Sequence, residues 1–190
     1  LDRVQQVADW KQVLTNQRLA EADLNHGRAV YAKTCQRCHV LYGIGETVGP
    51  ELTGSNRTDL DYLLRNLIDP SAEIPADYRA TIVATHEGRI VNGVLLRETD
   101  EILVLASETG RIELAQSEVV ARRTDPNSLM PEGQLDALEE AEVVDLVAYL
   151  GSSGQVSRRL LAGEGGELFD GKTLAGWSGA DGIWTVEQGE

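Results

Sequence analysis

The sequence has little cysteine, no long apolar run and few basic residues, and each shortage excludes a class of protein. Two cysteines among 190 residues cannot build a disulfide framework, so the fold must depend on a hydrophobic core. No segment approaches the run of about 18 apolar residues that a membrane-spanning helix needs. The 17 basic residues stand against 31 acidic ones, and a net charge of -14 argues against a nucleic-acid or anionic-membrane surface. We therefore expect neutral or basic partners.

The remaining composition is that of an ordinary globular protein. Hydrophobic residues make up 42% and charged residues 25%, which argues against a disordered chain. The first ten residues, LDRVQQVADW, lack the basic and then apolar layout of a signal peptide. Any signal that exports or anchors the protein is therefore expected outside these residues.

Several segments have the periodicity of helices. Residues 1–20 carry an incomplete apolar stripe, broken by polar residues at 15–17, and we interpret residues 1–22 as a helical extension that packs on something upstream. Residues 23–34 predict a second helix, in which Gly27 and Tyr31 suit a close helix crossing. Residues 58–70 predict a third, with a capping-box signature in Thr58 and Asp61. Residues 139–150 predict a last helix, capped by Gly151.

Between the third and last helices the period changes to two. Residues 78–122 contain five short runs rich in β-branched residues and leucine, separated by the turn sequences HEGR, RETD, SETG and QS. This pattern predicts a small antiparallel sheet or barrel inserted between helices. The Gly/Ser-rich residues 152–166 read as a linker. Residues 167–190 predict two strands of a β domain, too few to bury a core alone.

The two cysteines lie in the sequence CQRCH, residues 35–39. This is the spacing of c-type haem attachment, in which Cys35 and Cys38 bind the two vinyl groups covalently and His39 is the proximal iron ligand. Two other readings use the same residues. A thioredoxin-like CxxC motif would need a preceding strand and a parallel sheet. A zinc site would need a fourth ligand, for which His26 and His86 are the candidates.

A haem iron held by His39 needs a sixth ligand or an open face, and the chain contains one methionine. Met130 lies in SLMPEG, where Pro131 stiffens the loop between the predicted sheet and the last helix. Thioether ligation raises the reduction potential and suits electron transfer. The alternative is that Met130 only fills a gap in the core. His86 precedes a turn and reads as a surface residue, and His26 lies on the wrong side of its helix.

The sequence VGPELTG follows the CQRCH motif at residues 48–54. A backbone carbonyl at Gly49 or Pro50 is placed to accept a hydrogen bond from the second imidazole nitrogen and to fix the ring of His39. The alternative is an ordinary turn.

These segments together resemble a known family. The order of YAKTCQRCH, VGPELTGSNRTDLDYLLRNLIDPSAEIPADYRATIV, SLMPEG and EVVDLVAYL is similar to the haem-binding cytochrome c domain of planctomycetes and verrucomicrobia, over residues 24–151. The tail at residues 167–190 resembles the start of a 3-keto-disaccharide hydrolase-type, concanavalin-like domain. This short resemblance assigns no hydrolytic role to any residue of the chain.

The resemblance implies a mainly α, class I cytochrome c fold with a small antiparallel β insertion, α+β overall. It implies one covalent haem c with His39 and Met130 as axial ligands, and a crossing of the first and last helices at Gly27, Tyr31 and Tyr149. The expected division is an extension at 1–22, a mono-haem domain at 23–151 that includes 78–122, the linker at 152–166 and the truncated domain at 167–190.

The charge pattern adds a prediction about partners. No basic residue lies between Arg123 and Arg158, and the seven acidic residues of this stretch are Asp125, Glu132, Asp136, Glu139, Glu140, Glu142 and Asp145. Because this acidic stretch brackets Met130, it is placed to steer a basic redox partner. The alternative is a solvated face that only aids solubility.

The resulting functional prediction is electron transfer by a c-type haem, serving an exported dehydrogenase in the periplasm or cell envelope. A second reading makes this domain the redox relay of a larger carbohydrate-active enzyme, and a third makes it a haem-based sensor with a labile sixth ligand. The cytochrome domain itself is expected to carry electrons rather than to catalyse a reaction.

Overall fold

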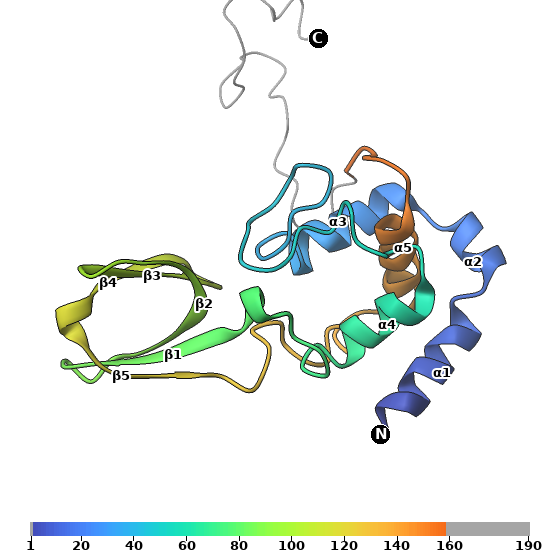
Figure 1. Cartoon of the computed structure of the whole chain (residues 1–190). Coiled ribbons are helices and arrows are strands. Elements are labelled where there is room, and N and C mark those ends of the chain that lie inside the picture. The colour runs from blue at the N-terminus through green and yellow to red at the C-terminus, as the bar shows by residue number, and fades with distance from the viewer. Residues whose placement is uncertain (1, 159–190) are drawn as a thin grey trace, which may run out of the picture. The chain divides into compact units, whose positions relative to one another are not determined.

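A computed structural model describes residues 2–158 and shows an α+β architecture (Figure 1). The described part contains five α-helices and one five-stranded antiparallel sheet, so the fold is α+β and the expectation of a mainly α fold understates the sheet. The helices are α1 (Arg3–Val13), α2 (Asn16–Glu21), α3 (Leu24–Thr34), α4 (Leu60–Ile68) and α5 (Glu140–Gly151). The strands are β1 (Ala80–Thr85), β2 (Ile90–Glu98), β3 (Ile102–Ser107), β4 (Gly110–Ala115) and β5 (Val119–Thr124).

The first 21 residues form two helices rather than one interrupted helix. Thr15 is the N-cap of α2, and its hydroxyl oxygen accepts a hydrogen bond from the backbone N–H of Arg18 at 3.3 Å. The polar break at residues 15–17 is therefore the start of α2. We expected this segment to pack on something upstream; within the described residues α1 contacts α4, and Leu14, at 2% exposure, belongs to the main core.

Helices α3 and α5 cross closely at Gly27, as the sequence predicted. A Cβ on Gly27 would lie 2.0 Å from the backbone oxygen of Asp145, so only glycine permits this approach. The rings of Tyr31 and Tyr149 pack beside the crossing with their centroids 5.7 Å apart. Asp23 caps α3 by accepting hydrogen bonds from the N–H groups of Asn25 and His26.

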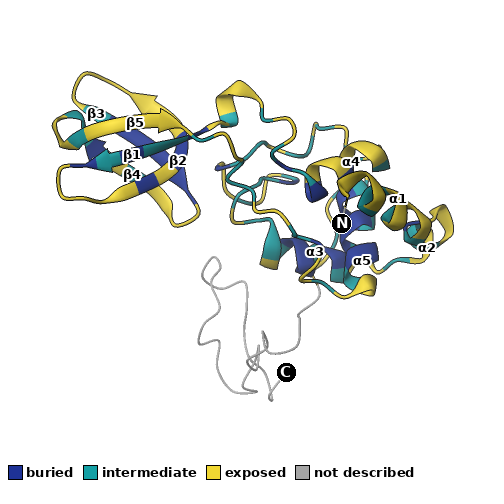
Figure 2. Cartoon of the chain, turned by 90° about the horizontal axis from the view of Figure 1, so that it is seen from below, coloured by how far each residue is buried: buried dark blue, intermediate teal, exposed yellow. Residues whose placement is uncertain are grey.

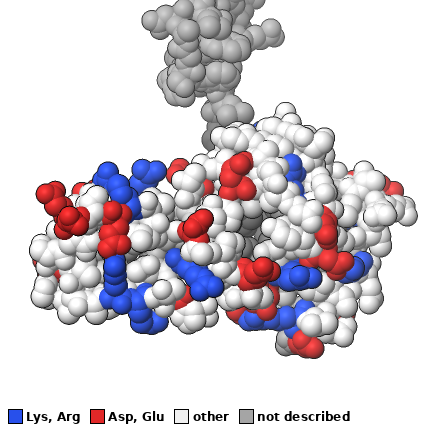
Figure 3. All heavy atoms as spheres, viewed as in Figure 1, with Lys and Arg blue, Asp and Glu red and all other residues white. Residues whose placement is uncertain are grey.

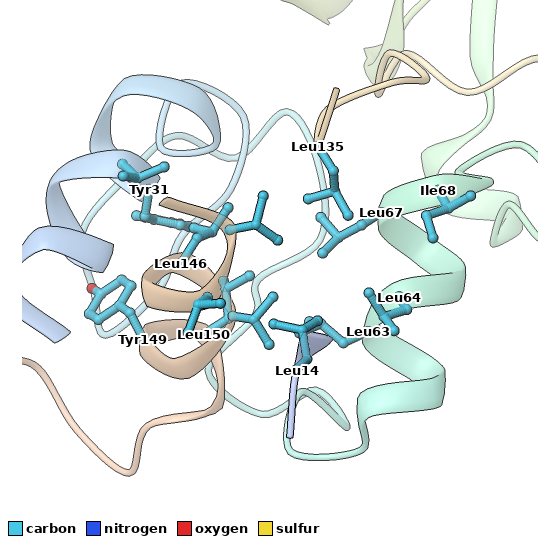
Figure 4. Close-up of a cluster of buried hydrophobic side chains, with 14 of the residues drawn as sticks. Leu14, Tyr31, Leu63, Leu64, Leu67, Ile68, Leu135, Leu146, Tyr149 and Leu150 are labelled. Carbon is cyan, nitrogen blue, oxygen red and sulfur yellow. The ribbon is translucent and has the colours of Figure 1, made fainter. Parts of the chain in front are cut away.

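The main core lies between this crossing and α4. Four apolar residues of α4 are buried and face residues from α3, α5 and the N-terminal segment (Figure 4). The four are Leu63, Leu64, Leu67 and Ile68. The predicted cap of this helix was wrong by one residue, because Asp59 rather than Thr58 is the N-cap and accepts from the N–H of Tyr62 at 3.0 Å.

The start of α5 is fixed by a capping box. Glu139 is the N-cap, and the side chain of Glu142 accepts a hydrogen bond from the backbone N–H of Glu139 at 2.9 Å. Gly151 was expected to be the C-terminal cap, but it is the last helical residue and Ser152 is the cap. The buried face of α5 then runs from Val143 to Leu150.

The sheet has the strand order β4-β3-β2-β1-β5, and every pairing is antiparallel. It has a small core of its own, made by Val83, Val91, Leu103, Leu105 and Leu114. Figure 2 shows the buried parts of the sheet and of the helices as separate regions of dark blue. The strands span residues 80–124, close to the alternating segments that the sequence showed.

The described residues belong to one compact unit. A compact unit, Leu1–Arg159, includes every described residue. Within the predicted linker, Gln155 accepts a hydrogen bond from the hydroxyl of Tyr149 at 2.8 Å, and the backbone oxygen of Val156 accepts one from Arg28. The end of that linker and the predicted domain at 167–190 lie outside the described residues.

Candidate functional site

The CQRCH motif begins where α3 ends. Cys35 is the C-cap of α3, and its backbone oxygen accepts hydrogen bonds from the N–H groups of Cys38 and His39, both at 3.0 Å. This turn places both thiols and the imidazole against one cavity. The three side chains of the CxxCH motif therefore come together because residues 35–39 form a single backbone turn after α3.

The surroundings of the two thiols differ from those of a reactive CxxC pair. Burial raises the pKa of the Cys35 thiol to about 11. Burial and the negative charge of Glu108 raise the pKa of Cys38 as well. Redox-active cysteines have lowered pKa values, and CxxC motifs of thioredoxin type belong to parallel sheets. Here the motif follows a helix and every described strand pairing is antiparallel, so the thioredoxin-like reading is not supported.

His39 is held from two sides. Its Nδ1 lies 2.8 Å from the backbone oxygen of Pro50, and because a carbonyl oxygen only accepts, Nδ1 carries the proton. The hydroxyl of Tyr31 donates to the backbone oxygen of His39 at 2.6 Å. Burial lowers the pKa of the imidazole, although the Pro50 hydrogen bond opposes this shift. A neutral ring with its proton on Nδ1 leaves Nε2 free to bind a metal.

Gly49 gives the ring of His39 its space. A Cβ on Gly49 would lie 2.5 Å from Cε1 and 2.9 Å from Nδ1 of that ring. The backbone of the VGPELTG segment thus packs directly on the imidazole. Gly49 and Pro50 therefore have different roles. Gly49 leaves space for the imidazole ring of His39, and the backbone oxygen of Pro50 accepts the hydrogen bond from Nδ1.

Met130 lines the same cavity as Cys35, Cys38 and His39, although about 90 positions separate it from them in the chain. Its neighbours Ser128, Leu129 and Pro131 also line the cavity. The rest of the wall is largely apolar and comes from the loop after His39, from α4 and from the residues that follow α4. It includes Val48, Leu52, Leu63, Leu67, Pro70, Ile74 and Pro75. All five site residues of the sequence analysis, of which Pro50 is the fifth, therefore line one cavity.

The segment that contains the sheet contributes to this cavity. Tyr78, at the end of the short 3-10 helix η1 (Ala76–Tyr78), and Val94 of β2 both line it. The alternation in the sequence predicted the strands but gave no indication that one of them reaches the cavity. A contact between a strand residue and a distant helical cavity has no local sequence pattern.

Arg57 is a further residue of the site that the sequence analysis missed. Its Nη1 donates to the backbone oxygens of Leu150 at 2.6 Å and Ser152 at 2.5 Å, at the C-terminal end of α5. Its guanidinium also lies over the ring of Tyr42, 4.9 Å from the centroid, and Nη1 donates to the hydroxyl of Tyr42 at 2.9 Å. Arg57 lines the cavity as well, so it connects the cavity wall to the end of α5.

The other histidines lie elsewhere. Nδ1 of His26 pairs with Oδ2 of Asp145 at 2.8 Å, at the crossing of α3 and α5. His86 is exposed in the turn after β1. Within residues 2–158, no three His, Cys, Asp or Glu side chains gather into a group able to hold a metal ion, so the zinc reading gains no support there.

The acidic stretch of residues 125–145 is largely engaged within the protein. Glu132 pairs with Arg3 at 2.6 Å, Glu140 pairs with Arg18 at 2.8 Å and Asp145 pairs with His26. On the face shown in Figure 3, acidic and basic side chains are interspersed over both the sheet and the helices. This arrangement favours the solvated-face alternative for part of the stretch.

The donor set fits a c-type haem. Two thiols and a neutral imidazole adjoin a largely apolar cavity, and a thioether lines the same cavity. Cys35 and Cys38 are free thiols, as covalent attachment to the vinyl groups requires. No helix within residues 2–158 is long and apolar enough to cross a bilayer.

Comparison with known families agrees with this chemistry. Residues 22–91 match the family model of cytochrome C oxidase, cbb3-type, subunit III. No curated protein matches the chain. The matched region contains the CQRCH motif and Pro50 and ends within β2, so it does not include Met130. The similarity supports a cytochrome c haem-binding domain, with a covalently bound haem c, its iron, and a redox partner for haem-based electron transfer.

Proposed function

We propose that this protein carries electrons by a single haem c with His39 and Met130 as its axial ligands, and that it serves an exported dehydrogenase in the periplasm or cell envelope. The observation that carries the proposal is the convergence of Met130 with Cys35, Cys38 and His39 on one largely apolar cavity. When bound, haem c supplies reversible one-electron chemistry at its iron.

The chain's own residues would set the properties of the group. Pro50 accepts the hydrogen bond from Nδ1 of His39, which strengthens the imidazole as a donor and fixes its orientation. The thioether of Met130 would favour the ferrous state of a bound haem, because sulfur of this kind is a soft ligand. Because the cavity wall is largely apolar, it would limit the exposure of a bound haem to water and so raise its reduction potential.

The location follows from the same chemistry. Domains with c-type haem are generally exported, and we propose the periplasm or cell envelope for this one. The reading as a relay inside a carbohydrate-active enzyme depends on residues 167–190, which lie outside the described residues, so no structural observation favours it.

The test of this proposal is removal of the thioether in the haem-loaded protein. Met130→Leu keeps most of the side-chain volume, so it separates loss of sulfur from loss of packing, whereas Met130→Ala removes both. Both variants should retain covalent haem, because Cys35, Cys38 and His39 are unchanged. Both should lose the weak red absorption of ferric sulfur-to-iron charge transfer, bind carbon monoxide when reduced, and have a lower reduction potential.

His26→Gln and His86→Gln are the matched controls and should leave all three properties unchanged. If Met130→Leu keeps its low-spin spectrum and potential while one of the histidine variants changes them, the iron has two histidine ligands and the assignment of Met130 is wrong. Carbon monoxide binding to the reduced wild-type protein would favour the sensor reading instead.

A further inference from the structure

Two serines connect the backbone of Met130 to the end of α4. The N–H of Met130 donates to Oγ of Ser128 at 3.1 Å. The N–H of Ser128 donates in turn to Oγ of Ser71, also at 3.1 Å, across 57 positions of the chain. Both hydrogen bonds are partly buried, so competition from water is reduced.

Ser71 is a well-supported anchor for this chain of hydrogen bonds. It follows Pro70, which is buried directly after α4. Helix α4 is itself fixed by four apolar side chains in the main core. A hydrogen bond to Ser71 therefore ties residues 128–130 to the turn that follows a helix packed in the main core.

The same loop is also tied to the base of the sheet. The N–H of Asp125 donates to the backbone oxygen of Ala80 at 2.8 Å. The carboxylate of Asp125 accepts from the N–H of Asn127 at 3.0 Å and from the side chain of Asn92 at 3.1 Å. The loop is thus held at its start by the sheet and at residue 128 by Ser71, which leaves Leu129 and Met130 against the cavity.

We propose that Ser128, held by Ser71, is a positioning residue that keeps Met130 at the haem cavity. The inference rests on the proposed ligand role of Met130 and deepens it, because Ser128, which also lines the cavity, accepts from the backbone N–H of Met130, and Ser71 acts through Ser128. Without the serine hydroxyls the loop has more conformations available, and an external ligand displaces Met130 more easily.

The expected size of the effect follows from the loss of one partly buried hydrogen bond. Such a bond contributes about 1 kcal/mol, which corresponds to about a fivefold change in an equilibrium constant. Ser128→Ala and Ser71→Ala should therefore each raise the affinity of the ferric holoprotein for imidazole about fivefold, measured as loss of the red sulfur-to-iron absorption during titration. Ser128→Thr keeps the hydroxyl and should restore an affinity close to that of the wild type.

Ser107→Ala is the matched control. Oγ of Ser107 accepts from the N–H of Thr109 at 3.2 Å, which is the same contact between residues two positions apart, but it lies in the turn between β3 and β4. The control should bind imidazole with wild-type affinity. If Ser128→Ala and Ser71→Ala match this control, Ser128 has no positioning role and the inference is overturned.

The outcome for Met130→Leu separates this inference from the proposed function. If Met130→Leu increases imidazole affinity and the serine variants do not, the ligand assignment holds and only the positioning role fails. If Met130→Leu also leaves the affinity and the red absorption unchanged, the ligand assignment itself is wrong. Where Ser128→Ala yields too little holoprotein, Ser71→Ala decides the question, because it leaves the contact between Ser128 and Met130 in place.

Discussion

The crossing of α3 and α5 should fail when a single methyl group is added at Gly27. The Cβ of Gly27→Ala would lie 2.0 Å from the backbone oxygen of Asp145 and 2.8 Å from Cβ of Tyr149. Contacts under 3.0 Å are essentially never found, and the nearest atom belongs to helix backbone, which cannot rotate away. The two helices must therefore move apart by about 1 Å at this point.

The cost of this separation can be estimated from the side chains that pack beside Gly27. Tyr31, Leu146 and Tyr149 are all buried there, at no more than 2% exposure. Burial of a side chain of this size contributes about 2–3 kcal/mol, and a gap of this width forfeits up to about half of the contact energy. The three together lose about 3 kcal/mol. Alanine is favoured over glycine in a helix by about 1 kcal/mol, so the net loss of unfolding free energy is about 2 kcal/mol.

The assay is guanidinium unfolding of the haem-loaded protein, followed by far-ultraviolet circular dichroism. Gly54→Ala is the matched control, because no atom lies within 4 Å of the position of its added Cβ. The control should unfold within about 0.5 kcal/mol of the wild type. If Gly27→Ala unfolds at the same denaturant concentration as Gly54→Ala, the helices do not approach as closely as the structure has them.

Two further substitutions probe the site and its surface. Gly49→Ala places a Cβ 2.5 Å from Cε1 of His39, so the ring must tilt away from Pro50, and we expect a severalfold lower ratio of haem to protein than in Gly54→Ala, measured by absorbance. Glu140→Lys replaces the ion pair with Arg18 by like charges and leaves the capping box of α5 intact. If the acidic stretch steers a basic partner, this variant should slow electron exchange with a cationic reagent and weaken its dependence on salt, with an unchanged haem spectrum. Unaltered rates with cationic and anionic reagents would assign the stretch to solubility alone.

The features that the sequence predicted are those encoded by neighbouring residues. The CQRCH motif forms within one backbone turn. The alternating runs form strands because each short run contains both its apolar face and the turn residues that end it. The crossing at Gly27 was also predictable, since a small residue beside a tyrosine on one helix face indicates a close approach. In each case the local feature is encoded by nearby residues, whereas the identity of α5 as the partner of α3 came from the family resemblance.

Two details could not be predicted from neighbouring residues: the residue that caps α4 and the segments that the first helices contact. Thr58 and Asp59 are adjacent residues that both suit an N-cap, and only the backbone path decides that Asp59 accepts from Tyr62. The first helices looked as though they needed an outside partner because their stripe is incomplete. In the structure α1 contacts α4 and α2 contacts α5, and both partners lie far along the chain, where nothing in the first helices identifies them.

The charge that the acidic stretch presents also depends on residues that are distant in sequence. Read along the chain, it is a run of negative residues that no basic residue interrupts. In the folded chain Arg3 and Arg18 pair with Glu132 and Glu140, and the imidazole of His26 contacts Asp145. A charge pattern counted along the sequence therefore overstates the field that a partner meets, because folding brings arginines from distant segments against the acidic stretch.

The position of Met130 depends on contacts that are equally remote in sequence. A segment of more than 50 residues separates Ser71 from Ser128, yet the N–H of Ser128 donates to Oγ of Ser71, and the N–H of Asp125 donates to the backbone oxygen of Ala80. These two hydrogen bonds hold the start and the end of the sheet-bearing segment next to each other. Met130, two residues after Ser128, therefore stays beside the cavity that His39 also lines. The sheet-bearing segment takes part in the site beyond its two ends as well, because Tyr78 and Val94 line the cavity and burial together with the charge of Glu108, in the turn after β3, raises the pKa of Cys38.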